Sequence, residues 1–97
     1  MNKQTLGRVI RSEKRETDGY TYLYELTERK GRLMADFGVH LYSINVTMTD
    51  DSGRTRTGEA KDVFSSKEKA IEFFDKIVKN LATPIDLKYV IEDEIKV

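Results

Sequence analysis

The chain of 97 residues contains no cysteine and no tryptophan, and its only proline is Pro84. The lack of cysteine excludes disulfide bonds, thiol nucleophiles and cysteine-ligated zinc sites, and it fits a reducing compartment. No apolar run approaches the roughly 18 residues of a membrane helix, and the first residues, Met1 to Thr5, show no apolar segment of a secretory signal. We therefore expect a cytoplasmic protein that does not bind membranes.

Sequence features of catalytic, cofactor and metal sites are also absent. The glycines are scattered singly, whereas phosphate loops and nucleophile elbows need several within a few residues. His40 is the only histidine, and Ser43 would lie on the opposite face of the same strand. Asp50-Asp51 and Glu92-Asp93-Glu94 lack the ligand spacing of a calcium loop. The sequence predicts no catalytic residue, no cofactor and no metal, and hence a protein that is not an enzyme.

Positive and negative charges balance, with 17 Lys and Arg against 17 Asp and Glu. Their distribution is uneven: residues 1–61 carry 11 basic and 9 acidic groups, and residues 62–97 carry 6 and 8. All arginines lie in the first part, and because arginine forms bidentate contacts with carboxylates and phosphates, this hints at an anion-facing sheet edge. A net charge near zero argues against strong non-specific binding of nucleic acid.

Apolar residues at alternate positions predict strands over about 6–14, 20–27, 37–48 and 54–62. Asp18-Gly19 and the segment Asp50–Gly53 are typical of tight turns, so consecutive strands should form hairpins. The segment 37–48 places apolar residues in both phases, which is typical of a β-bulge or of a strand buried on both faces. The fourth strand alternates threonine with charge, as edge strands do.

Two helices are predicted after the strands. Ser65 and Glu68 form a capping box, and apolar residues then recur at intervals of three and four up to Leu81. Thr83 can cap a second helix with Pro84 in its first position. Its apolar contacts are expected from Ile85, Leu87, Tyr89, Val90, Ile91 and Ile95. The predicted fold class is α+β, in one domain over residues 1–97. A four-stranded antiparallel meander is followed by two C-terminal helices packed on one sheet face, in the order β-β-β-β-α-α.

Four short motifs recur in known sequences: Tyr22-x-Tyr24-x-Leu26, Phe37-Gly38-Val39, the run from Asp62 to Glu68, and the run from Pro84 to Asp93. Together, over about residues 20–95, they resemble a family of small uncharacterised proteins, a domain of unknown function, from clostridia and related Gram-positive bacteria. Members typically read tyrosine-glycine-isoleucine where this chain has Phe37-Gly38-Val39. The resemblance implies a cytosolic bacterial domain and transfers no functional residue.

Tyr20, Tyr22 and Tyr24 share one face of the second strand. Such a row can be an aromatic platform on which single-stranded nucleic acid stacks its bases while arginines follow the backbone. The residues of this possible surface are Arg8, Arg11, Tyr20, Tyr22, Tyr24, Arg29 and Arg32. The interpretation that we favour is that the first helix covers these tyrosines, because a sheet needs large side chains on its core face.

Two hypotheses about function follow. The leading one is a non-enzymatic protein-interaction or regulatory domain, whose partner is another protein or a second copy bound through the sheet. It rests on Val9 and Leu23, opposite the tyrosines, and on the two apolar phases of 37–48, which predict a partly apolar uncovered face. The alternative is a module that binds single-stranded nucleic acid through the tyrosines and arginines.

Overall fold

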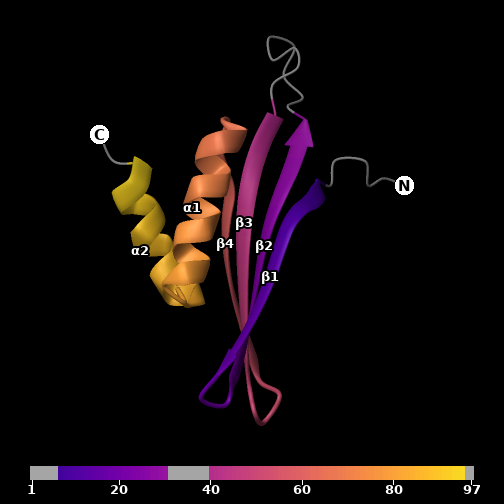
Figure 1. Ribbon diagram of the computed structural model, residues 1–97, viewed down its shortest axis with the longest axis vertical. Coiled ribbons are helices and arrows are strands. Elements are labelled where there is room, and N and C mark those ends of the chain that lie inside the picture. Colours follow the sequence, from indigo (N-terminus) through magenta and orange to yellow (C-terminus); the bar gives the residue numbers. More distant parts are fainter. Residues whose placement is uncertain (1–6, 31–39, 96–97) are drawn as a thin grey trace.

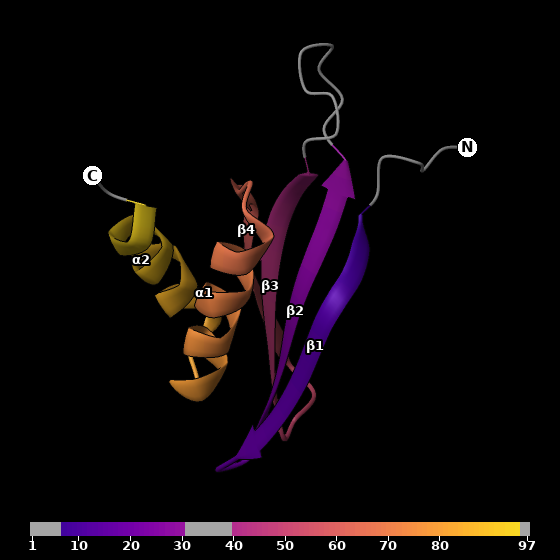
Figure 2. The same cartoon turned by 45° about the horizontal axis from the view of Figure 1, so that its top comes forward.

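The computed structural model describes residues 7–30 and 40–95. The elements are β1 (Arg8–Thr17), β2 (Tyr20–Lys30), β3 (His40–Asp50), β4 (Thr55–Phe64), α1 (Lys67–Lys79) and α2 (Pro84–Ile95). The strands form one antiparallel sheet in the order β1-β2-β3-β4, and both helices lie on the same side of it (Figures 1 and 2). The α+β fold class and the order β-β-β-β-α-α are confirmed.

Both predicted hairpin turns are present. Asp18 and Gly19 have φ angles of 51° and 82°, as a two-residue turn between twisted strands requires. In the β3–β4 turn the Asp50 carboxylate accepts hydrogen bonds from the backbone N–H groups of Ser52 and Arg54, both at 3.0 Å. Gly53 supplies the left-handed conformation there, with φ 89°. Local turn chemistry therefore sets the pairing of neighbouring strands.

The helices cover the tyrosine face of the sheet. In the centre of this face Tyr24 pairs with Val46 and Leu26 pairs with Ile44, and all four side chains are fully buried. The buried side chains of α1 that pack in this core include Phe73, Phe74 and Ile77. The whole buried apolar core comprises Tyr22, Tyr24, Leu26, Tyr42, Ile44, Val46, Ala60, Ala70, Phe73, Phe74, Ile77, Val78, Ala82, Leu87 and Ile91. The period of two in β2 thus predicted which side chains share the core face.

Strand boundaries differ from the predicted ones. The first strand is displaced toward the turn and reaches Thr17, and β2 continues to Lys30, so that Arg29 lies in a strand rather than in a loop. The register shift against β3 occurs opposite Tyr42 and Ile44 and is produced by extra residues in β4, where Asp62 has φ 54°. The irregularity therefore lies in β4. Of the two apolar phases expected in residues 37–48, Leu41 lies on the uncovered face and Tyr42 on the helix-covered face, so this end of β3 is apolar on both sides; Phe37 and Val39 lie outside the described residues.

The first helix begins one residue later than predicted. Ser66, in an extended conformation, is the N-cap, and its hydroxyl accepts a hydrogen bond from the N–H of Lys69 at 3.3 Å. Ser65 is exposed and directly follows the last residue of β4, so its position is still governed by the strand. Phe73, next to Phe74, is also buried in the core.

The second helix begins as predicted at Pro84, after the cap residue Thr83. The Thr83 hydroxyl accepts from the N–H of Asp86 at 3.1 Å, and the Asp86 carboxylate accepts from the N–H of Thr83 at 3.2 Å. This reciprocal arrangement is a capping box. The sequence predicted Thr83 as the cap but not the hydrogen bond that the Asp86 carboxylate accepts. It fixes where α2 leaves the turn.

Two contacts attach the α1–α2 turn to the sheet. The buried Tyr24 hydroxyl donates to the carbonyl of Ala82 at 2.9 Å. Pro84 lies directly over Gly58 of β4, where an added Cβ would approach the Pro84 carbonyl oxygen to 2.5 Å. Burial raises the pKa of Tyr24 from 10.0 to about 12, because a phenolate would be poorly solvated there.

Removal of the Tyr24 hydroxyl should destabilise the fold. We expect Tyr24→Phe to lower the free energy of unfolding by about 1–3 kcal/mol at neutral pH, because the Ala82 carbonyl loses its buried donor. In the native protein, stability contributed by the neutral phenol is lost as the pH rises from 10 toward 12, so the difference from the variant should narrow over that range. Urea denaturation at neutral pH and between pH 10 and 12 measures the two free energies of unfolding. Tyr20→Phe, which changes an exposed ring, is the control. A difference between native protein and Tyr24→Phe that stays constant with pH would contradict the role given to the Tyr24 hydroxyl.

Gly58 should tolerate no side chain. We expect Gly58→Ala to lower the free energy of unfolding by about 1–3 kcal/mol, since the methyl group would overlap the backbone of Pro84 and force α2 away from β4. Thr57→Ala, at the neighbouring exposed position, should change stability by less than about 0.5 kcal/mol. Urea denaturation of the two variants compares them directly, and equal effects would show that α2 does not rest on Gly58.

Candidate interaction surfaces

The three tyrosines of β2 are not a common platform. Tyr22 and Tyr24 are 9% and 0% exposed, and their rings stack with centroids 6.1 Å apart beneath the helices. Tyr20 is 42% exposed and meets Tyr22 at a tilted angle, with centroids 6.4 Å apart. Only Tyr20 offers a ring face to a ligand, so a row of three stacking surfaces is not formed. The favoured interpretation, that these side chains serve the core, applies to Tyr22 and Tyr24.

Arg8 is engaged in a polar cluster at the other end of the helix-covered face. Its guanidinium donates to Glu28 Oε1 from Nη2 at 3.0 Å and from Nε at 3.3 Å. Glu28 Oε2 accepts from the Tyr42 hydroxyl at 2.8 Å. The hydrogen bonds from Tyr42 and then Arg8 hold the pKa of Glu28 below its ordinary value, against the opposing effect of burial. This cluster ties β1, β2 and β3 together.

Arg29 is engaged on the opposite face. Its Nη2 and Nε donate to the two carboxylate oxygens of Asp62 at 2.7 Å and 3.0 Å, and the N–H of Asp62 donates to the hydroxyl of Ser43 at 2.8 Å. The bond with Arg29 holds the pKa of Asp62 below its ordinary value. This bidentate pair stabilises the bulged end of β4.

The predicted arginine surface does not converge. Arg8 and Arg11 pair with residues of the helix-covered face of β2, whereas Arg29 lies on the uncovered face. Arg11 is exposed and donates to the neighbouring carbonyl of Ile10. Arg32 lies outside the described residues. The described arginines of this set therefore lie on two faces of the sheet and present no single anion-binding surface.

The uncovered face of the sheet is mainly polar. Val9, Leu23 and Leu41 lie there, each paired with a polar residue, and Val9 is about half exposed. The remaining paired positions carry hydroxyl, amide or charged groups, namely Ser12, Lys14, Glu16, Thr21, Thr27, Glu25, Arg29, Ser43, Asn45, Thr47, Thr49, Thr55, Thr57 and Glu59. A shallow depression of about 560 Å³ on this face is lined mainly by such groups. Among the described residues, the apolar part of the uncovered face consists of Val9, Leu23 and Leu41, which lie among polar side chains.

The free edge at β1 is closed by its own charges. Arg15 pairs with Glu13 at 2.9 Å and Lys14 with Glu16 at 3.6 Å, each pair on one face of the strand. A charged edge of this kind discourages pairing with another sheet. Neither the uncovered face nor this edge is therefore an attractive apolar docking surface.

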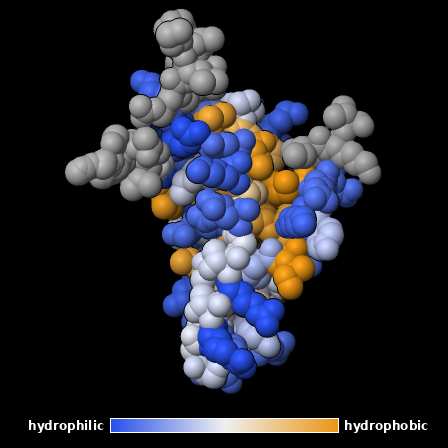
Figure 3. All heavy atoms as spheres, turned by 180° about the vertical axis from the view of Figure 1, so that it is seen from behind, coloured by the Kyte–Doolittle hydropathy of each residue, from blue (hydrophilic) through white to orange (hydrophobic). Residues whose placement is uncertain are grey.

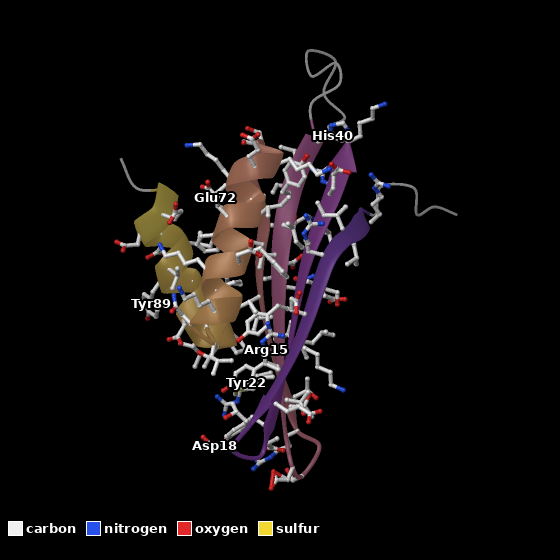
Figure 4. The ribbon with its side chains drawn as sticks, viewed as in Figure 1. Arg15, Asp18, Tyr22, His40, Glu72 and Tyr89 are labelled. Atoms are coloured by element: carbon white, nitrogen blue, oxygen red, sulfur yellow. The ribbon has the colours of Figure 1, made fainter. Side chains whose placement is uncertain are left out.

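An exposed apolar stripe occurs instead on α2. Ile85 and Tyr89, one helical turn apart, are 61% and 62% exposed, although apolar contacts were predicted for both. Leu87 and Ile91 occupy the side of α2 that is buried against the sheet, which turns Ile85 and Tyr89 outward. Figure 4 shows Tyr89 on the side of α2 that faces away from the sheet.

We call Ile85, Tyr89, Glu92 and Asp93 the α2 stripe. Glu92 lies on the line of Ile85 and Tyr89 at helical spacing, and Asp93 adjoins it; both carboxylates are exposed. Lys88 is the only basic residue among the described residues of α2, against Asp86, Glu92, Asp93 and Glu94. The stripe is thus apolar at its beginning and acidic at its end.

A second surface lies where the hairpins extend beyond the helices (Figure 1). A depression of about 440 Å³, which we call the Tyr20 ledge, is lined there by Tyr20, Met48, Asp50, Arg54, Thr55 and Arg56. Arg54 Nε lies 3.6 Å from the Asp50 carboxylate. Met48 and Arg56 pair with each other on the helix-covered face; Met48 is half-buried against the edge of the core, and Arg56 is exposed. Seen from behind, the hairpin tips are pale and blue, whereas orange apolar side chains gather nearer the helices (Figure 3). The ledge is therefore a mainly polar surface that carries one exposed aromatic ring and charges of both signs.

Within residues 7–30 and 40–95, no group of three or more His, Cys, Asp or Glu side chains is placed to hold a metal ion. His40 and Ser43 alternate onto opposite faces of β3, and Ser43 is bound to Asp62. The Asp50 carboxylate is occupied in its turn. No helix among these residues is long and apolar enough to cross a membrane.

The Arg8–Glu28–Tyr42 cluster predicts a dependence of stability on pH. We expect Glu28→Gln to lower the free energy of unfolding by about 1–3 kcal/mol near neutral pH, because hydrogen bonds to a carboxylate are stronger than those to an amide. The native contribution is present above the ordinary pKa of 4.5 and is lost as the pH falls below it. Urea denaturation from pH 7 to pH 3 should therefore show the two proteins converging in acid. Glu25→Gln, on the other face of β2, is the control, and an equal pH response of that variant would contradict the assignment.

Comparison with known proteins places the chain in a family without a described activity. No curated protein and no solved structure matches the sequence. A family model described as a family of unknown function, DUF6514, matches residues 3–97. This agrees with the expected resemblance to a family of uncharacterised proteins and extends over nearly the whole sequence. The chain belongs to the family of unknown function DUF6514.

Proposed function

We propose that this protein is a non-enzymatic protein-interaction domain that binds its partner through the α2 stripe. The observation that supports this most directly is the exposure of Ile85 and Tyr89, about three fifths each, on a helix whose other side is packed on the sheet. Aromatic residues that are exposed next to an aliphatic residue are typical of binding hot spots. The uncovered sheet face, which the sequence predicted as the docking surface, is mainly polar. Its polarity favours α2 over the sheet as the docking surface.

Leu81, between the two helices, supports the same surface. It is 37% exposed and has φ 53°, and the N–H groups of Leu81 and Ala82 bond back to Val78 and Ile77 in the pattern of a helix C-cap. Glycine is preferred at this position, because a side chain there costs about 1 kcal/mol. An exposed leucine in a strained conformation adds apolar area beside the start of α2, which is consistent with a binding role.

We further propose that the protein works in the cytoplasm of Gram-positive bacteria such as clostridia. The support is the resemblance of its short motifs to proteins of that origin and a composition without cysteine, which fits a reducing compartment. Purification of the untagged protein from its source by cell fractionation would test this, and recovery in the extracellular fraction would contradict it.

A second candidate function, binding of single-stranded nucleic acid, has support only at the Tyr20 ledge. There the exposed ring of Tyr20 lies with Arg54, Arg56 and Asp50 around one depression. A ring next to arginines suits a stacked base and its phosphate, but the Asp50 carboxylate, 3.6 Å from Arg54, opposes the binding of an anion. One ring and two arginines make a smaller surface than the seven residues expected from the sequence. The protein-interaction function is the one that the geometry favours.

The test is affinity capture with the α2 stripe altered. The tagged protein should retain one stoichiometric protein from its native lysate, with or without nuclease, and Ile85→Ser/Tyr89→Ser should retain less than about a tenth of it, as expected when two anchors are removed. Glu72→Ser, exposed on α1, is the matched control, and circular dichroism checks that each variant is folded. Equal retention by the double variant would refute the proposal, and retention that collapses with nuclease would favour the nucleic-acid function.

A further inference from the structure

We infer that the partner of the α2 stripe is a basic amphipathic helix of another protein. This inference rests on the proposed function, since it names the chemistry that the same stripe would recognise. The stripe combines two exposed features: the apolar side chains of Ile85 and Tyr89, and the carboxylates of Glu92 and Asp93 about one turn beyond them. The first feature requires an apolar contact, and the second requires a positive charge next to it.

The acidic end of the stripe is not explained by the stability of α2 itself. A helix carries partial negative charge at its C-terminal end, where lysine and arginine are favourable and carboxylates are not. The last turn of α2 contains no basic residue, whereas Glu92, Asp93 and Glu94 lie there. The acidic side chains and the helix dipole therefore combine into a negative potential next to an exposed tyrosine.

Neighbouring lysines leave Glu92 and Asp93 without a salt bridge in the described part of the chain. The Lys76 ammonium group, on the adjacent helix α1, lies 3.3 Å from the Glu94 carboxylate. Lys88 precedes Glu92 by one turn, which is the less favourable order for an i,i+4 pair, and no salt bridge joins the two. The carboxylates of Glu92 and Asp93 are therefore open to a positive charge from a partner.

The shape of the stripe favours a helix as its occupant. The backbone groups of α2 are hydrogen-bonded within the helix, so the stripe offers side chains and no strand edge. From Ile85 to Asp93 the helix axis rises by about 12 Å, which matches two to three turns of a second helix packed along it. That helix should present aliphatic residues at a spacing of three or four to Ile85 and Tyr89, and lysine or arginine one turn further along.

The same charges argue against other occupants. A second α2 stripe would bring carboxylates together at an interface, which is costly. Anionic lipid surfaces and nucleic-acid phosphates attract basic segments and would be repelled by the acidic end of the stripe. An uncharged apolar partner would partly desolvate Glu92 and Asp93 without supplying a counter-charge. A basic amphipathic helix satisfies both parts of the stripe.

A peptide library tests this chemistry with a defined probe. Helix-forming peptides of about 20 residues, randomised on one side, are displayed on phage and selected on the whole protein. Peptides that also bind Ile85→Ser/Tyr89→Ser are removed, so that the retained peptides use the stripe. We expect these to be enriched in lysine and arginine relative to the unselected library, next to aliphatic residues at helical spacing. Retained peptides without that enrichment would overturn the inference.

Reversal of the acidic end should reverse the selection. A retained peptide should bind Glu92→Lys/Asp93→Lys at least about tenfold more weakly than wild type in fluorescence anisotropy at low salt, and selection on this variant should enrich aspartate and glutamate. Asp51→Lys/Glu59→Lys is the matched control, because it makes the same change of net charge at exposed positions in the β3–β4 turn and on the uncovered face. It should bind as wild type does. Circular dichroism checks that each variant is folded.

The outcomes separate this inference from the proposed function. If peptides are retained through Ile85 and Tyr89 but lack basic residues, or do not respond to the charge reversal, the basic helix is refuted and the proposed function stands. If no peptide is retained through these two residues, the inference fails. The proposed function is then decided separately, by whether wild type captures a protein from the native lysate that Ile85→Ser/Tyr89→Ser does not.

Discussion

The attachment of the α1–α2 turn to the sheet is the constraint on which the exposed surfaces depend. One hydrogen bond, from the buried hydroxyl of Tyr24 to the carbonyl of Ala82, ties this turn to the centre of the sheet. The close approach of Pro84 to Gly58 sets where α2 begins. Because a helix starts there with a fixed phase, Leu87 and Ile91 face the sheet, and Ile85 and Tyr89 face outward. A change at this turn would therefore alter both the core and the binding surface.

The charged residues divide into structural and exposed groups. Glu28, Arg29 and Asp62 are held in hydrogen-bonded clusters that join strands, and the charges along β1 pair within the strand. At the β3–β4 turn Arg54 lies 3.6 Å from the Asp50 carboxylate. On α2 the exposed carboxylates of Glu92 and Asp93 follow Tyr89. The net charge of zero thus does not make every local surface neutral, since the exposed side of α2 is acidic at its end.

The uncovered sheet face is mainly polar and faces water. Hydroxyl-bearing side chains dominate that face, and half-buried threonines suit a sheet that faces water on one side. The exposed large apolar side chains are Leu81, Ile85 and Tyr89 near the α1–α2 turn and on α2, Tyr20 beside the β1–β2 turn, and Val9 on the uncovered face. The helices stop short of the hairpin ends of the strands (Figure 1).

The sequence by itself determined the features that depend on local spacing. These are the turns at Asp18-Gly19 and Asp50–Gly53, the shared face of Tyr22 and Tyr24, and the start of α2 at Pro84, since each follows from backbone preference or from a period of two. Only the tertiary structure decided the rest. Ile85 and Tyr89 satisfy an apolar pattern as well as Leu87 does, and a short helix that is apolar on several sides cannot show from its sequence which side the sheet will cover. The partners of Arg8 and Arg29 were equally hidden, because residues 20 and 33 positions away supply their carboxylates and only the register of the sheet brings them together.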